Sequence, residues 1–305
     1  MRVPQMSHKT CLMALLLSVG AKHATAQLPA TPAAWTSVEE ALGRKGAMQP
    51  GNVIKFSFPR SDLTVVVDGV TLKPALALGG WVAFDDVGHR QTMVMGDLVL
   101  TEDEVVPVMR ALEEGVVEPT SLHNHVSRES PRVMYMHISA HGDAGKIAAT
   151  IKSALSQTHT PLGTPGAPAA PSAADLDTAG IARALGIAGK LNGVVYQVAV
   201  PRTERITEKG HAVPASMGVA TAINFQPTGG GKAAITGDFV MLGSEVNAVI
   251  RELQAHGINP SALHSHMLDE SPRLFFMHFW ANDDAVTLAK GLRAALDHTA
   301  SKRGS

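Results

Sequence analysis

The sequence has almost no cysteine, few aromatic residues and no excess of either charge. Cys11 is its single cysteine, aromatic residues make up 4% of the chain, and 26 basic side chains stand against 27 acidic ones. No basic cluster is present, and neutralising phosphates requires lysine and arginine, so we expect no nucleic-acid partner. No apolar run is long enough for a transmembrane helix, so we also expect no stable membrane span.

The N-terminus has the pattern of a secretory signal peptide. Two basic residues flank or precede the short apolar stretch Cys11–Val19, and Ala24-Thr25-Ala26 is a small-residue cleavage site. The pattern predicts a signal peptide over residues 1–26 and a mature chain that begins at Gln27. An ordinary N-terminal helix is the alternative. We therefore expect a periplasmic or secreted protein.

Cleavage at this site would change the chemistry that the chain can perform. Cys11 would be lost, which excludes a disulfide, a thiolate ligand and a cysteine nucleophile from the mature protein. The loss fits an oxidising compartment, where a stray thiol is a liability. Three basic residues would also leave, so 26 basic against 27 acidic side chains becomes 23 against 27, a net charge of −4. No lipobox-type cysteine stands at the cleavage site, which favours a soluble protein over a lipid-anchored one.

Comparison of the sequence with itself reveals an internal duplication. Residues 96–125, GDLVLTEDEVVPVMRALEEGVVEPTSLHNH, align without a gap with residues 237–266, GDFVMLGSEVNAVIRELQAHGINPSALHSH. The match continues from residues 129–144 to residues 270–285 at the same offset. Self-similarity over this length indicates two copies of one structural unit.

The segment between the copies differs in composition from both of them. Residues 158–175 are rich in proline, alanine and glycine and nearly free of large apolar side chains, which is typical of a semi-extended linker. We therefore expect one repeat domain over residues 36–157, a linker over 158–175 and a second repeat domain over 176–299.

Apolar periodicity predicts the same elements in both copies. Spacing of i, i+3, i+4, i+7 predicts helices, and alternating or continuous apolar runs predict strands. The predicted strands are residues 53–58, 76–84, 91–95 and 194–200, and the predicted helices are residues 105–112, 147–155, 246–253 and 288–296. Thr101 followed by Glu104 forms a capping-box pattern before the first of these helices. The fold class expected is α+β, with two tandem homologous domains, each a mainly antiparallel sheet with helices packed on one face.

Each repeat carries the same set of reactive side chains at the same spacing. The set is His123, His125, Glu129, Arg132 and His137 in the first copy and His264, His266, Glu270, Arg273 and His278 in the second. Residues i and i+2 of a strand point to the same face. A hairpin centred on Pro131 would place His125 opposite His137, with Glu129 above them. This geometry predicts one patch of three imidazoles beside a carboxylate in each repeat.

Such a patch is suited to metal chemistry. Neutral imidazole is a good ligand for transition-metal ions, and three histidines with an open position form a familiar catalytic site. We expect a divalent transition metal, with zinc first and copper or manganese as alternatives. Glu129 and Glu270 would act as a fourth ligand or as the catalytic base, and Arg132 and Arg273 would bind an anionic substrate group.

Three interpretations of function follow from this set of residues. The first is an exported metal-binding protein that acts as a metal-dependent hydrolase. The second is a non-catalytic binding module, such as a metal carrier or ligand sensor, whose partner is a small molecule or the metal itself. The third is a duplicated structural domain in which the histidines are hydrogen-bonded core residues.

Two further repeated features are interpreted as structural. Asp143 and Asp284 precede the closing helices, which indicates N-capping in preference to metal ligation. Gly96-Asp97 and Gly237-Asp238 are interpreted as the beginning of a strand. The second copy has the more apolar return strand, so we expect one site to be active and the other to support it.

Several segments together resemble a known bacterial family. MGDLVLTEDEV, SLHNH and YMHISAHGD in the first copy, and TGDFVMLGSEV and ALHSHMLDESPRLFFMHFWANDDA in the second, resemble the LppY/LpqO family. Its members are secreted proteins and lipoproteins of unassigned function with this doubled domain. The resemblance covers roughly residues 36–298 and implies export and a repeat structure. It adds no activity, and this chain lacks the lipobox cysteine of the lipoprotein members.

Overall fold

The computed structural model describes Met1 and residues 35–163, 170, 172 and 175–302. Apart from Met1, the predicted signal peptide over residues 1–26 lies outside the described residues, as does most of the C-terminal half of the predicted linker. In the part of the chain that is described, no helix combines the length and the apolar character needed to cross a membrane.

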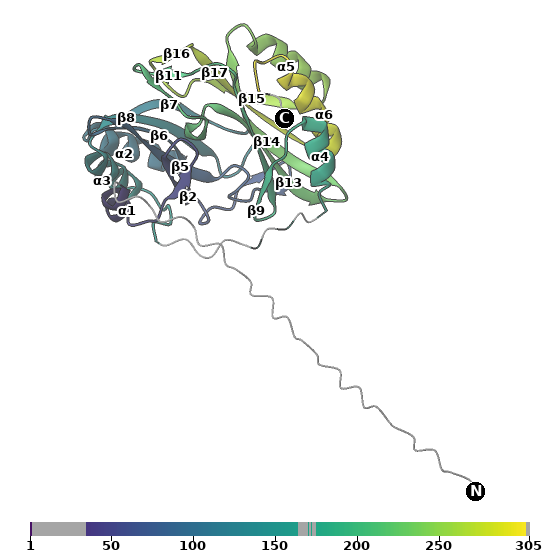
Figure 1. Cartoon of the computed structure of the whole chain (residues 1–305), viewed down its shortest axis with the longest axis horizontal. Helices are drawn as coiled ribbons and strands as arrows, with labels where there is room; N and C mark the ends of the chain where they lie inside the picture. The colour runs from purple at the N-terminus through teal and green to yellow at the C-terminus, as the bar shows by residue number, and fades with distance from the viewer. Residues whose placement is uncertain (2–34, 164–169, 171, 173–174, 303–305) are drawn as a thin grey trace. The chain divides into compact units, whose positions relative to one another are not determined.

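The two repeats share most of their elements in the same order (Figure 1). The first contains α1 (Thr36–Leu42), β1 (Ala47–Gln49), β2 (Val53–Pro59), β3 (Val66–Val67), β4 (Val70–Thr71), β5 (Gly79–Gly88), β6 (Gln91–Thr101), α2 (Glu102–Glu113), β7 (Glu118–His123), β8 (Val133–Gly142) and α3 (Ala144–Leu155). The second contains α4 (Thr178–Leu185), β9 (Lys190–Asn192), β10 (Val195–Pro201), β11 (Thr207–Glu208), β12 (His211–Ala212), a 3₁₀ turn (Ala215–Met217), β13 (Ala220–Gly229), β14 (Lys232–Leu242), α5 (Val246–Ala255), β15 (Asn259–His264), β16 (Glu270–Ser271), β17 (Leu274–Asp284) and α6 (Ala285–Leu296).

Each repeat builds one six-stranded sheet. The strand order is β1-β2-β5-β6-β8-β7 in the first and β9-β10-β13-β14-β17-β15 in the second, and neighbouring strands in both sheets pair antiparallel. The two orders are equivalent strand by strand. The predicted fold class, two tandem α+β domains with mainly antiparallel sheets, is confirmed.

Local sequence signals determine where the helices begin. Thr101 and Glu104 form the predicted capping box at the start of α2. Asp143 and Asp284 accept hydrogen bonds from the backbone N–H groups of Lys146 and Thr287, so the predicted N-caps of α3 and α6 are present. These caps satisfy N–H groups that have no partner within the helix, which is why each helix begins at that residue.

The helices of each repeat cover one face of its sheet. Leu98 and Ile138 of the first sheet pack in the same buried core as residues of α1, α2 and α3. Phe239 and Phe279 do the same in the second repeat with α4, α5 and α6. Figure 1 shows α1, α2 and α3 on one side, α4, α5 and α6 on the opposite side, and the two sheets between them.

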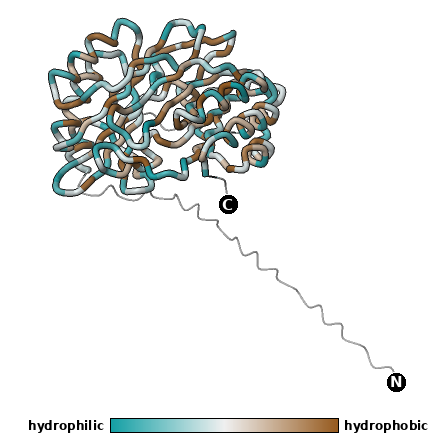
Figure 2. Tube along the Cα trace, turned by 90° about the horizontal axis from the view of Figure 1, so that it is seen from above, coloured by the Kyte–Doolittle hydropathy of each residue, from teal (hydrophilic) through white to brown (hydrophobic). Residues whose placement is uncertain are grey.

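The opposite faces of the two sheets pack against each other. One buried cluster joins Met95 of the first repeat to Phe276 of the second, and another joins Tyr135 to Trp280. Hydrophobic and hydrophilic residues are interleaved along the trace (Figure 2), as expected for strands whose neighbouring residues face different layers. The layers therefore run helix, sheet, sheet, helix, and polar side chains on the inner faces lie at the junction between the repeats.

Candidate metal centre

The histidines lie on the strands and loops that line the inner faces of the sheets. His137 and His278 lie within β8 and β17, and His123 and His264 are the last residues of β7 and β15. His125 and His266 follow in the loops. The repeat thus uses a strand end, a loop and a return strand to position three imidazoles.

The register of the hairpin differs from the sequence prediction. His137 pairs with Ser121, and His123 pairs with Tyr135, after a shift in register between Pro119 and Ser121. The predicted pairing of His125 with His137 is wrong, because β7 ends at His123 and His125 belongs to the loop.

Two aspartates join the histidines. Asp97 pairs with His137 across β6 and β8, and Asp238 pairs with His278 across β14 and β17. Gly96-Asp97 and Gly237-Asp238 therefore lie inside β6 and β14, and their interpretation as the beginning of a strand is wrong. The sequence did contain a signal for these aspartates, since both recur at one fixed spacing before His-x-His.

The imidazoles of both repeats form one continuous stack. Its members are His123, His125, His137, His264, His266 and His278, and with Asp97 and Asp238 we call them the histidine–aspartate cluster. The rings of His123 and His264 face each other across the two repeats with centroids 3.5 Å apart. His125 lies 3.8 Å from His278, and His137 lies 3.7 Å from His266. The structure thus brings all six predicted ligands into a single shared cluster, in place of one patch in each repeat.

The imidazole and carboxylate atoms of this cluster that could ligate a metal are buried and lack hydrogen bonds. The Nε2 atoms of all six histidines and the Oδ1 atoms of both aspartates have no hydrogen-bond partner within the described chain. The shortest carboxylate contacts place His266 Nε2 2.9 Å from Asp238 Oδ2 and His125 Nε2 3.5 Å from Asp97 Oδ2. Leaving one buried polar group unsatisfied costs about 1–3 kcal/mol. A cation that accepts these lone pairs would remove that cost, so the donor set fits a metal ion.

Backbone carbonyls select the tautomer of three of the histidines. Nδ1 lies 2.6 Å from the Gly237 carbonyl oxygen in His278 and 3.1 Å from the Asn124 oxygen in His123. In His264 it lies 3.4 Å from the Ser265 oxygen. A carbonyl oxygen only accepts, so we assign the proton to Nδ1, which leaves the Nε2 lone pair free. Metal-binding histidines commonly show this arrangement.

Burial favours the neutral form that metal ligation requires. It lowers the pKa of His123 to about 4 and that of His264 to about 2. Burial also lowers the pKa values of His137, His266 and His278 well below the usual range. These five imidazoles are therefore neutral at pH 7, and their Nε2 lone pairs are available.

Three groups of ligand atoms are compact enough to share an ion. The atoms of each group lie within 4.8 Å of one another; the groups are His123 with His125 and His278, His123 with His137 and His264, and Asp238 with His264 and His266. Two of the three groups combine residues of both repeats. The chemistry of the cluster is therefore a property of the junction between the repeats.

The predicted glutamates lie outside these groups. Among the described residues, no compact ligand group includes Glu129 or Glu270. Glu270 accepts hydrogen bonds from Leu274 N–H at 3.0 Å and from Arg273 at 3.2 Å, so its carboxylate fixes its own turn. Burial raises the pKa of Glu129 above its usual value, and one of its oxygens is buried without a hydrogen bond.

The predicted substrate-binding arginines point to other partners. Arg132 is largely exposed and its closest acidic neighbour is Glu102, at 3.8 Å. Arg273 donates to the carbonyl oxygens of Met267 and Leu268 in its own loop. Among the described residues, the partners of these arginines are thus local side chains and backbone carbonyls, with no histidine of the cluster among them.

Each repeat helps to position the second histidine of the other. The Ser261 hydroxyl donates to the carbonyl oxygen of His125, and the Thr120 hydroxyl donates to the carbonyl oxygen of His266 at 2.5 Å. Ser261 and Thr120 occupy equivalent places in β15 and β7. These reciprocal bonds fasten the two loops that carry His125 and His266.

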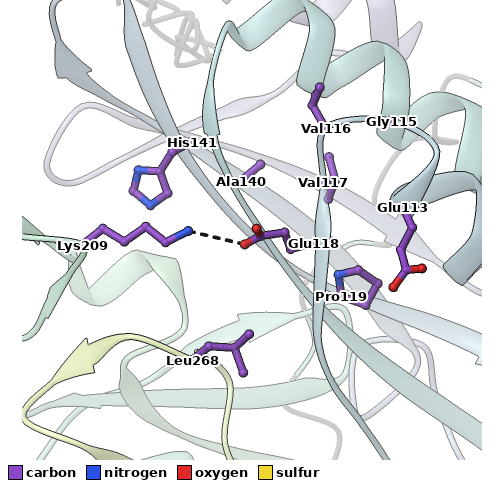
Figure 3. A pocket seen from close by; sticks show the side chains of 10 residues that line it. All are labelled: Glu113, Gly115, Val116, Val117, Glu118, Pro119, Ala140, His141, Lys209 and Leu268. Carbon is purple, nitrogen blue, oxygen red and sulfur yellow. Dashed lines mark hydrogen bonds and ion pairs between the residues drawn. The ribbon is translucent and has the colours of Figure 1, made fainter.

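A surface pocket of about 540 Å³ lies close to the same junction but is a separate feature. Figure 3 shows Lys209 of the second repeat reaching Glu118 of the first, with the two side chains 3.4 Å apart and His141 beside them. None of the six cluster histidines lines this pocket.

Comparisons with known proteins identify the family but no activity. A trimeric bacterial microcompartment shell protein, PduB, is similar at 14% identity over 83% of this chain and 90% of its own, with a TM-score of 0.21. EtuB from Clostridium kluyveri is similar at 11% identity over 82% of this chain and 89% of its own, with a TM-score of 0.19. With TM-scores this low, neither structure indicates a role for this chain. No curated protein matches the chain. A family model described as Domain of Unknown Function (DUF1259) matches residues 36–157 and again residues 179–298, and the chain belongs to that family as a protein with two copies of the domain.

Proposed function

We propose that this protein binds divalent transition-metal ions in the histidine–aspartate cluster between its two repeats. One observation carries the proposal: six buried Nε2 atoms and two buried carboxylate oxygens converge without hydrogen-bond partners in the described chain. A purely structural core would pair such groups, because buried polar atoms are almost always hydrogen-bonded. Imidazole nitrogen with carboxylate oxygen, and no thiolate, suits zinc, with copper and manganese as alternatives.

The burial of the cluster supports a binding module over a hydrolase. His137 and His278 are each 3% exposed, and His266 is 5% exposed. A catalytic zinc site keeps an open position that water and substrate reach, whereas a closed site is completed by protein ligands. A metal carrier or metal-stabilised module is therefore the function that this geometry supports best.

The metal content of the purified protein tests the proposal. The full chain would be purified without a histidine tag, stripped with chelator, dialysed against zinc, copper or manganese, and analysed by mass spectrometry. We expect tight binding of at least one equivalent, with zinc preferred. Less than about a tenth of an equivalent of every metal would remove the proposal and leave a structural role.

Matched variants locate the ion. His123→Ala should weaken binding, because His123 belongs to two of the three ligand groups. His256→Ala is the control, since His256 lies at the end of α5 and contacts Glu252. Glu129→Gln should keep the metal, since Glu129 is not in a ligand group. Loss of metal from Glu129→Gln but not from His123→Ala would indicate that the ion binds at the turn that contains Glu129 and not in the cluster.

Export and the LppY/LpqO affiliation stay predictions. N-terminal sequencing of the protein from the culture medium or periplasm tests the export, with Gln27 as the expected first residue. Retention of Met1 in cytoplasmic protein would contradict it.

A further inference from the structure

The geometry points to two metal ions in the cluster, each held by ligands from both repeats. We propose that Asp97, His123 and His125 of the first repeat bind one ion together with His278 of the second. Asp238, His264 and His266 of the second repeat bind the other together with His137 of the first. This inference rests on the proposed metal-binding function and specifies its stoichiometry and its ligands.

Equivalent distances relate the two halves of the cluster. Within a repeat, the rings of His123 and His137 lie 5.0 Å apart and those of His264 and His278 lie 4.8 Å apart. Across the repeats, the His125–His278 and His137–His266 distances are 3.8 and 3.7 Å. The two halves therefore follow a local two-fold relation, with the stacked His123 and His264 at its centre. A site on one side therefore has an equivalent set of residues on the other.

The compact groups of ligand atoms show which repeat completes each site. The ligand atom of His278 lies within 4.8 Å of those of His123 and His125 of the other repeat. The ligand atom of His137 lies within 4.8 Å of that of His264 of the other repeat, in a group that also contains His123. The return-strand histidine of each repeat is therefore placed to serve the site of the other. The ligand groups of His123 with His125 and His278, and of Asp238 with His264 and His266, are parts of these two sites.

The number of donors favours two ions over one. A structural zinc ion takes four ligands, almost always tetrahedral. One ion at the centre, on His123, His137 and His264, would leave five of the eight donors buried without a partner, at about 1–3 kcal/mol each. Two ions use three histidines and one aspartate each and account for every donor in the cluster.

Because each ion would be bound by residues of both repeats, metal binding would also link the two sheets. One ion would link β6 and β7 of the first repeat to β17 of the second. The other ion would link β14 and β15 of the second repeat to β8 of the first, so the two ions together would hold one sheet against the other. The hydroxyl bonds from Ser261 and Thr120 to the opposite loops support the same junction. Metal binding should therefore hold the two repeats together.

Paired substitutions in the full chain distinguish exchanged from unexchanged ligands. In the exchanged arrangement Asp97 and His278 serve the same ion, so Asp97→Asn with His278→Ala should remove one zinc equivalent of two. Asp238→Asn with His278→Ala should remove both, because those residues serve different ions. If each repeat bound its own ion, these two results would be reversed. Asparagine keeps the volume of aspartate but is a poor zinc ligand, which limits disturbance of the fold.

The mirror pairs keep the test decisive if one variant fails to fold. Asp238→Asn with His137→Ala should keep one equivalent, and Asp97→Asn with His137→Ala should keep none, with circular dichroism checking the fold and His256→Ala retaining both ions. Reversed stoichiometries would overturn the exchange, and a single equivalent in the unaltered protein would overturn the two-ion site. No metal at all in the unaltered protein would instead overturn the proposed function itself.

Discussion

The buried ion pair between Arg60 and Glu104 should control the stability of the first repeat. The guanidinium donates to both oxygens of Glu104, at 2.6 and 3.1 Å, and also to the Val99 carbonyl oxygen and to Asp62. Arg60 is 1% exposed and Glu104 is 3% exposed. Removing one partner of a buried pair costs about 3–5 kcal/mol when the other charge is left alone, but Asp62 would still pair with Arg60, so we expect about 2–3 kcal/mol. Glu104→Gln should therefore lower Tm by about 4–6 °C, at roughly 2 °C per kcal/mol for a protein of this size.

A double-mutant cycle measured by urea and thermal denaturation tests this reasoning. Arg60→Met should cost at least as much as Glu104→Gln, because it also removes the bonds to Val99 and Asp62. The double variant should cost less than the sum, because both changes remove the Arg60–Glu104 pair. The exposed pair of Arg132 and Glu102 is the control, and Glu102→Gln should leave Tm unchanged. A cost below about 1 kcal/mol for Glu104→Gln, or additive effects in the cycle, would refute the argument.

The same pair predicts a dependence of stability on pH. Burial alone would raise the pKa of Glu104, but hydrogen bonds from Arg60 and from the backbone N–H groups of His159 and Thr101 outweigh it and lower the pKa. The unfolded state then binds more protons in acid, so this stabilisation is present above the unfolded pKa of about 4.3 and is lost as pH falls through the folded pKa. Below pH 5, Glu104→Gln should show a weaker loss of stability with acidification than the unaltered protein. Equal slopes would contradict the assignment.

Three further outcomes are expected. Ser261→Ala removes the hydroxyl bond to the His125 carbonyl and should weaken zinc binding about tenfold by calorimetric titration, as loss of a supporting contact does; unchanged affinity would count against the positioning role. Gly237→Ala would place the new Cβ 1.9 Å from the Ala222 carbonyl oxygen, and the Gly237 carbonyl oxygen is the hydrogen-bond acceptor for His278. Tm should therefore fall and zinc binding should weaken. A variant with normal Tm and affinity would exclude this close contact. Removing the metal with a chelator should lower Tm, because the protein loses the stabilisation that metal binding provides, about 2.7 kcal/mol per site when free metal is 100 times Kd. Identical thermal scans with and without chelator would contradict metal-linked stability.

Local chemistry explains why much of the fold could be predicted from the sequence. The period of apolar residues located α2 and α5, and the caps at Thr101 and Asp143 gave their helices the correct beginnings. The duplication predicted two equivalent sheets, because the same pattern of apolar residues in both copies buries the same face of each strand. The strand prediction was less accurate at its ends: β6 runs to Thr101, well past the predicted limit of residue 95.

The centre of the molecule depended on contacts that the sequence does not specify. A repeat offset shows that two units are alike but not which faces they turn toward each other. The register of β7 on β8 moved the pairing away from His125, and a loop carried that residue to His278 of the other repeat. Asp97 was overlooked because a single charged residue in an apolar strand has no local reason to be a ligand. Its partners come together only when both sheets are packed.

Packing of the two repeats also changes the meaning of their sequence differences. Tyr135 and Phe276 are equivalent, and the more apolar second copy suggested that one site is active and the other supports it. Tyr135 stacks on His125 at 3.2 Å and Phe276 stacks on His266 at 3.4 Å, so both aromatic rings perform the same task in one cluster. The tyrosine hydroxyl is used elsewhere, in a hydrogen bond to the Ala77 carbonyl oxygen. The polar difference between the copies therefore lies beside the cluster, and the residues that would bind metal are the same in both halves.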